Sequence, residues 1–240
     1  MLTLPSASLD SLPEQLTKLP PESRRELIEL LGEAEKRRKQ RAIDRYKPYD
    51  KQAEFHRLGA TNRERLLLGG NQTGKTIAGG AETAYHLTGE YPSWWDGWRC
   101  TGPVSGWVGG VTGESTRDNP QRILIGSPQR REEWGTGLIP GRSIINTTPA
   151  RGIADALDSV VVRHKSGGES VLLFKSYEKG REKWQGDTLD WMWLDEEPPP
   201  DIYTEALTRT NARQGRVILT CTPLLGMSDV MLMFLEDEKR

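Results

Sequence analysis

Residues 66–80 read LLLGGNQTGKTIAGG. A short apolar run is followed by a glycine pair, a polar segment, Gly-Lys-Thr and then residues that favour a helix. Residues 69–76 fit the pattern G-x-x-x-x-G-K-[ST] without departure, and their flanks supply the strand and the helix that this pattern requires. The stretch therefore predicts a phosphate-binding loop between a strand and a helix, and this unit decides the fold.

The residue types of this loop suit a triphosphate with a bound metal ion. Glycines let the backbone turn several N–H groups inward, and the helix that starts near Gly74 directs its positive end at the same point. Lys75 would contact the β- and γ-phosphates, and the Thr76 hydroxyl would bind Mg²⁺. The predicted nucleotide-binding residues of the loop are Gly69, Gly70, Asn71, Gln72, Thr73, Gly74, Lys75 and Thr76.

An acidic segment follows a second apolar strand. Residues 191–197 read WMWLDEE, and a run of three prolines comes next. We assign Asp195 to the metal and Glu196 to the general base, because these groups are needed beside the phosphates to hold Mg²⁺ and to polarise the attacking water. A glutamate directly after the metal aspartate favours a motor-type ATPase over a small GTPase. The alternative is an acidic cluster at the start of the next helix.

Two further segments extend the predicted site. Gln52 precedes the loop in YKPYDKQAEF, and a glutamine amide can pair with both N6 and N7 of adenine, which would favour ATP over GTP. Tyr49 or Phe55 could pack on the adenine ring. Downstream, ILTCTP ends a strand in Thr220-Cys221-Thr222, and the hydroxyls of Thr220 and Thr222 could sense the γ-phosphate. An ordinary polar side chain and an ordinary strand end are the alternatives.

Strand and helix patterns alternate along most of the chain. We expect an α/β fold, a P-loop NTPase of the ASCE/RecA-like type with a mostly parallel central sheet flanked by helices and an N-terminal helical arm. Gly167-Gly168 predicts a hairpin turn. The expected domains are a flexible N-terminus and helical arm over residues 1–47 and an ATPase domain over residues 48–240. The helix of the arm is expected to start at Pro21 and to end at Lys47, before a proline. Residues 91–107 and 126–157 are expected to be insertions over the sheet.

Composition limits the partners. The net charge is −1, so any contact with nucleic acid must come from local patches. The candidate patches are residues 36–41, KRRKQR, and the group Lys175, Lys179, Arg181 and Lys183, although solvated surfaces would look the same. The two cysteines lie far apart, which indicates reduced thiols. The sequence contains no apolar run of membrane-spanning length and no signal pattern, so we expect a cytoplasmic protein without a membrane partner.

Taken with these motifs, the chain resembles the large terminase subunits of tailed bacteriophages, and in particular those of short-tailed phages of enteric bacteria. The resembling stretches span residues 47–230 and are PYDKQAEF, GGNQTGKT, AETAYHLTGEYP, KGREKWQGDT, WLDEEPPPDIYTEALTRTN and LTCTPLLGMSD. The phosphate loop is generic, whereas WQGDT, DEEPP, ALTRTN and TPLLGMSDV are much more specific. By similarity, Gln52 belongs to the adenine motif, Asp195 and Glu196 to the metal and base pair, and Thr220 to Thr222 to the coupling motif.

The resemblance implies an ATP-driven motor for packaging DNA, with ATP and Mg²⁺ as cofactors. Such subunits form a ring, usually of five, at the portal vertex of an empty procapsid and pump duplex viral DNA inward. The implied partners are the DNA, the portal protein, the small terminase subunit and further copies of the chain, which could be monomeric in isolation. The implied place is the host cytoplasm and, transiently, the portal vertex, not the mature virion.

The family also needs an arginine that stabilises the transferred phosphoryl group. Arg122, Arg181 and Arg209 are the candidates, and Arg181 ranks first because it lies in a glycine-flanked loop before the acidic strand. For each of them a surface salt bridge is the alternative. The family's second half is an RNase H-type nuclease, and this chain stops at Arg240 without a helix stop signal. We therefore expect an ATPase fragment, engineered or naturally shortened, without nuclease activity.

Two other classes of protein remain open at this stage. In a nucleotide-gated binding module, ATP would set a conformation with negligible turnover. A superfamily-2 helicase would need a second RecA-like domain, which nothing after residue 223 supplies. Loss of phosphate release in Glu196→Gln, with ATP binding retained, would separate the motor from the gated module.

Overall fold

The structure is a computed structural model that describes residues 20–223, 226 and 228–237. The chain divides into two compact units, residues 1–39 and 40–240. The described part of the first unit is helix α2 (Pro21–Lys39). The prediction that this helix continues to Lys47 is wrong: the second unit starts with a 3-10 turn (Ala42–Arg45) that buries Ile43 in its core. Residues 1–19, predicted to be loose, and Leu224, Leu225 and Met227 of the TPLLGMSDV run lie outside the described residues.

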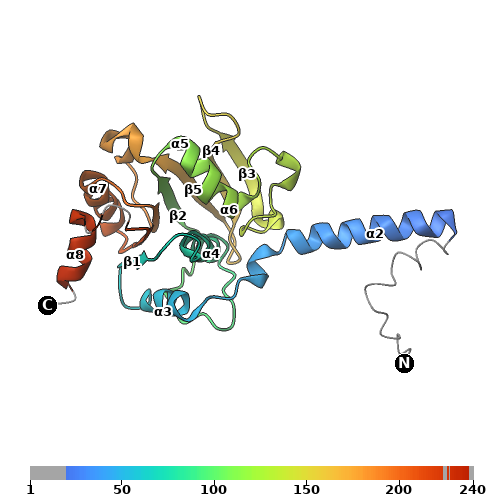
Figure 1. Ribbon diagram of the computed structural model, residues 1–240, viewed down its shortest axis with the longest axis horizontal. Coiled ribbons are helices and arrows are strands. Elements are labelled where there is room, and N and C mark those ends of the chain that lie inside the picture. Colours follow the sequence, from blue (N-terminus) through green and yellow to red (C-terminus); the bar gives the residue numbers. More distant parts are fainter. Residues whose placement is uncertain (1–19, 224–225, 227, 238–240) are drawn as a thin grey trace. The chain divides into compact units, whose positions relative to one another are not determined.

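The second unit is built on a seven-stranded sheet with the strand order β1-β7-β6-β2-β5-β4-β3 (Figure 1). From β1 to β5 in this order neighbouring strands are parallel, whereas β4 pairs antiparallel with β5, and β3 with β4. The mostly parallel sheet and the predicted β4–β5 hairpin are confirmed. The strands are β1 (Glu64–Leu68), β2 (Ser105–Gly110), β3 (Ile144–Pro149), β4 (Leu157–Arg163), β5 (Glu169–Ser176), β6 (Trp191–Asp195) and β7 (Arg216–Cys221).

Strand β3 lies inside residues 126–157, which were expected to be an insertion over the sheet. It forms the edge of the sheet, and its pairing with β4 contains irregularities beside Ile144 and Pro149. The strand reads IINTTP, without an alternation of apolar and polar side chains, and its residues are partly or fully exposed. A polar edge strand forms because a neighbour is available for pairing, so its own sequence carries little signal.

Helices cover both faces of this sheet. The helices are α3 (Asp50–Leu58), α4 (Lys75–Thr88), α5 (Gly113–Thr116), α6 (Arg122–Ile125), α7 (Pro200–Asn211) and α8 (Asp229–Asp237). Further 3-10 turns span Arg131–Glu133, Gly141–Ser143, Tyr177–Lys179 and Arg181–Trp184. Pro120 lies in a π-helical turn (Arg117–Gln121) that joins α5 to α6. A wide turn tolerates proline, which lacks the N–H group of a normal helical residue.

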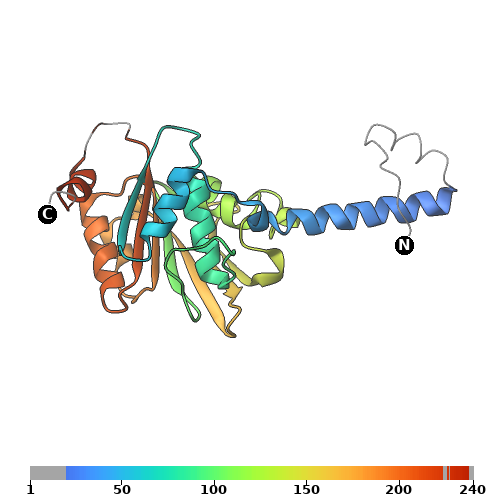
Figure 2. The ribbon, with the colours of Figure 1, turned by 90° about the horizontal axis from the view of Figure 1, so that it is seen from below.

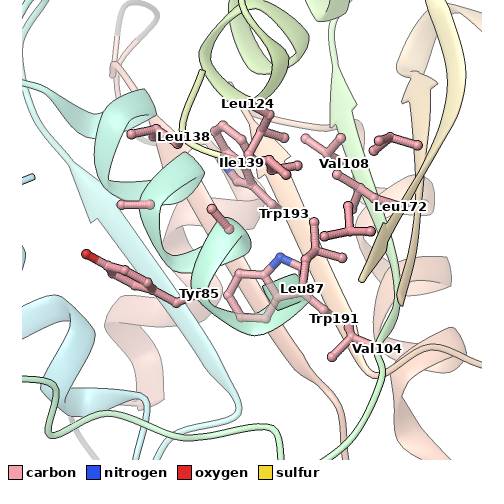
Figure 3. Packing of buried hydrophobic residues seen from close by; sticks show 14 of the residues in the cluster. Tyr85, Leu87, Val104, Val108, Leu124, Leu138, Ile139, Leu172, Trp191 and Trp193 are labelled. Atoms are coloured by element: carbon pink, nitrogen blue, oxygen red, sulfur yellow. The ribbon is translucent and has the colours of Figure 1, made fainter. Parts of the chain in front are cut away.

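The alternation of side chains along the strands separates two apolar layers. In β6, Trp191 and Trp193 pack with α4 and α6 in one layer (Figure 3), whereas Met192 and Leu194 pack with α7 and α8 in the other. Figure 2 shows α4 and α7 on opposite sides of the strands. Trp191 and Trp193 are both fully buried, in keeping with the apolar strand predicted before the acidic segment.

Close approach of α4 to the sheet depends on a glycine. An added Cβ at Gly79 would lie 2.5 Å from the indole of Trp193, so a larger residue would push α4 away from β6. The Trp-rich segment before β2 places one ring in the core: Trp95 is 2% exposed, whereas Trp94 is 37% exposed. Within the described residues, no helix has both the length and the apolar character needed to cross a membrane.

Candidate nucleotide-binding and hydrolysis site

The sheet topology brings the predicted site residues to one edge. Strand β7 lies between β1 and β6, and the three are parallel, so their carboxyl ends meet. In the register of these strands Thr220 lies beside Leu67 on one side and beside Asp195 on the other. The phosphate loop follows β1, the acidic pair follows β6 and the Thr220–Thr222 segment ends β7. Ligands of open α/β sheets bind at this edge.

The phosphate loop has the backbone that its glycines and polar residues allow. Gly74 adopts a left-handed conformation, with φ 81°, directly before α4. Gln72 also has a positive φ of 62°, which is costly for a residue with a side chain and is typical of functional loops. The Nζ of Lys75 donates to the carbonyl oxygen of Gly70 at 2.8 Å, and the Thr73 hydroxyl donates to the same oxygen at 2.9 Å. The positive charge of Lys75 therefore lies within the loop.

Asp195 is a buried carboxylate at the end of β6, with 4% exposure. Its Oδ1 accepts a hydrogen bond from the Thr220 hydroxyl at 2.8 Å. The indole Nε1 of Trp193 donates to that hydroxyl oxygen, also at 2.8 Å. The three groups form a chain of hydrogen bonds in which Thr220 has no second hydrogen to give. In the structure its hydroxyl donates to Asp195, and direct contact between Thr220 and a γ-phosphate stays a prediction.

Burial raises the pKa of Asp195 to about 7. The neighbouring charge of Glu196 acts in the same direction, whereas hydrogen bonds from Thr220 and Thr76 and the charge of Lys75 oppose it. A carboxylate held in this way gains from a nearby cation. Thr76 and Asp195 together offer a hydroxyl and a carboxylate oxygen, the hard ligands that Mg²⁺ prefers, so the residues present fit the predicted metal.

Glu196 takes an unusual backbone conformation beside this carboxylate. Its φ is 63°, its N–H donates to the carbonyl oxygen of Thr220 at 2.8 Å, and its Oε2 accepts from the N–H of Thr222 at 3.1 Å. The Thr222 hydroxyl lies 3.4 Å from Oδ1 of Asn71 in the phosphate loop. The predicted base, the coupling segment and the phosphate loop are thus in direct contact.

Gln52 lies against the phosphate loop from helix α3. Its Nε2 donates to the carbonyl oxygen of Gly74 at 2.9 Å, and its Oε1 accepts from the N–H of Tyr49 at 2.9 Å. A cavity of about 320 Å³ lies beside it, lined in part by Tyr49, Ile77 and Leu138. Tyr49 is 71% exposed and available to pack on a ring. The alternative for this role, Phe55, is wrong, because Phe55 is buried in the core under the guanidinium of Arg65.

The candidate arginines differ in their partners. Arg181 and Arg209 both pair with the buried carboxylate of Glu205 on α7, at 2.9 and 3.1 Å, so the salt-bridge alternative describes them. Arg122 is exposed and lines a groove of about 930 Å³ together with Ile77 of α4. The groove makes Arg122 the better-placed candidate of the three, and the arginine finger itself stays a prediction.

The predicted basic patch of Lys175, Lys179, Arg181 and Lys183 exposes fewer charged groups than expected, because Lys175 is partly buried. The Nζ of Lys175 lies 4.2 Å from the centre of the Trp107 ring and donates to the carbonyl oxygen of Lys183 at 3.1 Å. Burial lowers the pKa of Lys175. Lys179, Arg181 and Lys183 are the exposed members of the patch, and Arg181 is also paired with Glu205.

A buried polar cluster next to the site escaped the sequence analysis. Oε1 of Glu82 on α4 accepts from Nη2 of Arg65 on β1 at 2.5 Å, and Oε2 contacts Nδ1 of His56 on α3 at 2.7 Å. The Nε2 of His86 lies 3.4 Å from Oε1. Four residues before His56, Gln52 contacts Gly74, so α3 is joined both to the phosphate loop and to α4. Glu82 and His86 are four residues apart on α4, but Arg65 and His56 come from β1 and α3, so spacing along the sequence carried no signal for the whole cluster.

The fold and the site define a class of protein, a P-loop NTPase of the ASCE/RecA-like type. Its marks are the phosphate loop after β1, the additional strand β7 between β1 and β6, and the glutamate beside the acidic strand end. Residues 66–240 match the family of terminase large subunits described as T4likevirus-type, N-terminal, and the chain belongs to this family. The resemblance seen in the sequence motifs is confirmed.

Curated relatives agree with this assignment. The chain is 41% identical over 242 residues to the terminase large subunit of Salmonella phage P22, covering 94% of this chain and 48% of the relative. It is 28% identical over 244 residues to that of Enterobacteria phage LP7, covering 94% of this chain and 50% of the relative. The chain thus spans about half the length of these relatives.

Solved structures of terminases share the fold. The large terminase of a thermophilic bacteriophage matches with a TM-score of 0.56 and 17% identity, over 80% of this chain and 44% of that one. The same terminase in complex with ADP matches with a TM-score of 0.52 and 16% identity, over 80% and 44%. The large terminase ATPase domain of Thermus phage P74-26 matches with a TM-score of 0.50 and 21% identity, over 73% and 65%.

Proposed function

We propose that this chain binds ATP with Mg²⁺ and hydrolyses it to ADP and phosphate, as the ATPase domain of a motor that drives duplex viral DNA into procapsids. The observation that carries the proposal is the convergence of Lys75, Thr76, Asp195 and Glu196 at the carboxyl edge of β1, β7 and β6. A phosphate-binding charge, a metal site and a base then lie within one site, which is what phosphoryl transfer to water requires.

Each residue has a distinct role in the proposed reaction. Lys75 and the N–H groups at the start of α4 bind the β- and γ-phosphates, and Thr76 and Asp195 hold the metal. When bound, Mg²⁺ neutralises charge that develops on the phosphate oxygens. Glu196 accepts the proton of the attacking water, while its Oε2 accepts a hydrogen bond from the N–H of Thr222. This hydrogen bond would connect hydrolysis to the Thr220–Thr222 segment.

Selectivity for ATP is assigned to the cavity beside Gln52. Tyr49 and Ile77 offer apolar surface for a nucleobase, and the amide of Gln52 keeps one N–H and one lone pair beyond its contacts with Gly74 and Tyr49. Those two groups match N7 and N6 of adenine. The terminase of the thermophilic bacteriophage in complex with ADP is in keeping with an adenine nucleotide in this family.

Membership of the family supports a proposal for assembly and partners. We propose a ring of copies at the portal vertex, with duplex DNA, the portal protein and the small terminase subunit as partners in the host cytoplasm. Arg122 is the first candidate for an arginine that acts on the transferred phosphoryl group. Turnover per subunit that rises with protein concentration, and further with procapsids, is expected if neighbouring copies complete each site. A concentration-independent rate would contradict the shared site.

Glu196→Gln tests the proposed hydrolysis against a nucleotide-gated module. The amide cannot accept a proton, so ATP turnover is expected to fall by about a hundredfold or more, while the dissociation constant for ATP changes by less than about threefold. Phosphate release and binding of a fluorescent ATP analogue measure the two quantities. Absence of turnover in the unsubstituted chain, at any concentration and with procapsids, would favour the gated module. The family match favours the motor over the helicase alternative.

A further inference from the structure

A buried tyrosine, Tyr177, follows β5 directly and contacts the backbone of the acidic pair. Tyr177 is 5% exposed, and its hydroxyl lies 3.0 Å from the carbonyl oxygen of Glu196 and 3.1 Å from that of Asp195. The carbonyl oxygen of Gly109, at the end of β2, is 3.3 Å away. One phenol therefore contacts the backbone at the carboxyl ends of two neighbouring strands. Neither the phosphate-loop motif nor the acidic motif contains this residue.

The backbone that Tyr177 contacts is the strained one. Glu196 has a positive φ of 63°, a conformation that a residue with a side chain keeps only when its surroundings hold it there. Its N–H is bound to the carbonyl oxygen of Thr220, and its carboxylate to the N–H of Thr222. Both of these partners belong to the end of β7. Tyr177 holds the same residue from the opposite side of β6, through the carbonyl oxygen.

The ring of Tyr177 is itself fixed. It packs against Trp184, with 5.7 Å between ring centres, and Trp184 is fully buried, with its Nε1 donating to the carbonyl oxygen of Ser176 at 3.3 Å. Gly109 lies against both rings: an added Cβ there would come within 3.0 Å of the Tyr177 ring and still closer to Trp184. A hydroxyl carried on so tightly packed a ring has little freedom to move, which suits a group that sets a position.

We propose that Tyr177 is a positioning residue for Glu196: its hydroxyl holds the backbone at Asp195 and Glu196 and so sets the direction of the carboxylate that accepts the proton. The inference rests on the proposed hydrolysis. Tyr177 acts through Glu196 and does not contact the reacting atoms. Burial, with the nearby charges of Asp195 and Glu196, keeps the pKa of Tyr177 well above its usual value, so the phenol donates a hydrogen bond throughout the physiological range.

Tyr177→Phe removes the hydroxyl and keeps the ring, and Tyr203→Phe is the matched control. Tyr203 is also buried, at 2% exposure, and its hydroxyl contacts Oε2 of Glu64 at 2.8 Å, at the far end of β1 from the phosphate loop. For Tyr177→Phe, kcat for ATP is expected to fall about five- to tenfold with KM changed by less than about twofold, because the hydrogen bond to the backbone at Asp195 and Glu196 is lost. Tyr203→Phe is expected to keep kcat within about twofold. Equal kcat values for the two variants, or a change in KM alone, would overturn the inference.

Amide hydrogen exchange supplies a measurement that does not depend on turnover. The N–H groups of Glu196 and Thr222 are both bonded within the arrangement that Tyr177 supports. In Tyr177→Phe both are expected to exchange about fivefold faster than in the unsubstituted chain, and in Tyr203→Phe neither should change. Unchanged exchange at both amides overturns the positioning role. If the unsubstituted chain shows no turnover, the proposed hydrolysis fails, while the exchange data still decide the role of Tyr177.

Discussion

Two buried carboxylates, Glu82 and Asp195, show how differently one chemical group can be used. Glu82 is fully buried, and Asp195 is 4% exposed. Burial opposes the charge of Glu82, but the guanidinium of Arg65 and hydrogen bonds from His56 and His86 hold its pKa well below the usual value. Asp195 is bonded to hydroxyl groups, and burial raises its pKa to about 7.

The difference separates a structural site from a functional one. Glu82 has its cation within the protein, so its charge is balanced as soon as the chain folds. Asp195 instead accepts hydrogen bonds from neutral hydroxyl groups, and it lies beside Thr76 and the phosphate loop. A strongly perturbed carboxyl group in such a place indicates a site that a ligand completes. Substitution of each carboxylate and a pH series can establish whether the two differ in this way.

The largest effect is expected for Asp195→Asn. Loss of the carboxylate removes a metal ligand, so ATP turnover in Mg²⁺ should fall about a thousandfold, equivalent to about 4 kcal/mol. Stability should respond differently: at pH 8 without nucleotide, the free energy of unfolding should stay equal or rise, because a poorly compensated buried charge is gone. Phosphate release and urea unfolding measure these quantities. A large loss of stability would make Asp195 a structural residue like Glu82.

Glu82→Gln is expected to lower the free energy of unfolding by about 3 kcal/mol, because Arg65 would remain buried without its counter-charge. Glu205→Gln is the matched control. Glu205 is also buried, but its partners Arg181 and Arg209 are 53% and 23% exposed and can reach water. The control should therefore lose only about 1 kcal/mol in urea unfolding. Equal losses would show that Glu82 is not specially dependent on its cluster.

The smallest effect is a pH dependence. Without Mg²⁺ and nucleotide, the raised pKa of Asp195, about 7, means that the folded chain binds a proton that the unfolded chain has released. The stability from Asp195 is full below its unfolded pKa and is lost as pH rises through 7. The loss is about 2 kcal/mol between pH 5 and pH 7. The depressed pKa of Glu82 acts only at lower pH, where stability is lost as pH falls.

Urea unfolding at several pH values measures this slope, and Asp195→Asn provides its control. The fall in stability between pH 5 and pH 7 that Asp195 contributes should be lost in Asp195→Asn and retained in Glu205→Gln. Burial lowers the pKa values of His86 and His164, which adds a slope of opposite sign in every variant, so the difference between each variant and the unsubstituted chain is the quantity to compare. Saturating Mg²⁺ and ATP should also flatten it, because the bound cation favours the charged carboxylate. An identical slope in Asp195→Asn would assign the pH dependence to another group.

Much of the site could be predicted because its residues lie in short contiguous stretches of sequence. The phosphate loop needs glycines, a lysine and a threonine at fixed spacing, and Asp195 and Glu196 need only an apolar strand before them. Contacts between separate elements could not be predicted in this way. The amide of Gln52 contacts Gly74, Phe55 lies in the core and does not offer its ring to a ligand, and Arg181 is paired with Glu205.

The class of the protein, the phosphate loop, the acidic pair and the mostly parallel sheet could all be inferred from the sequence alone, because local spacing and alternation encode each of them. The insertion of β7 between β1 and β6, the edge position of β3 and the place of Tyr177 behind Glu196 depend on contacts between distant segments, so they emerged with the folded structure. The charge state of each buried carboxylate emerged there too. Glu82 and Asp195 are both acidic residues in largely apolar segments, and their pKa values diverge because folding places Arg65 beside one and hydroxyl groups beside the other.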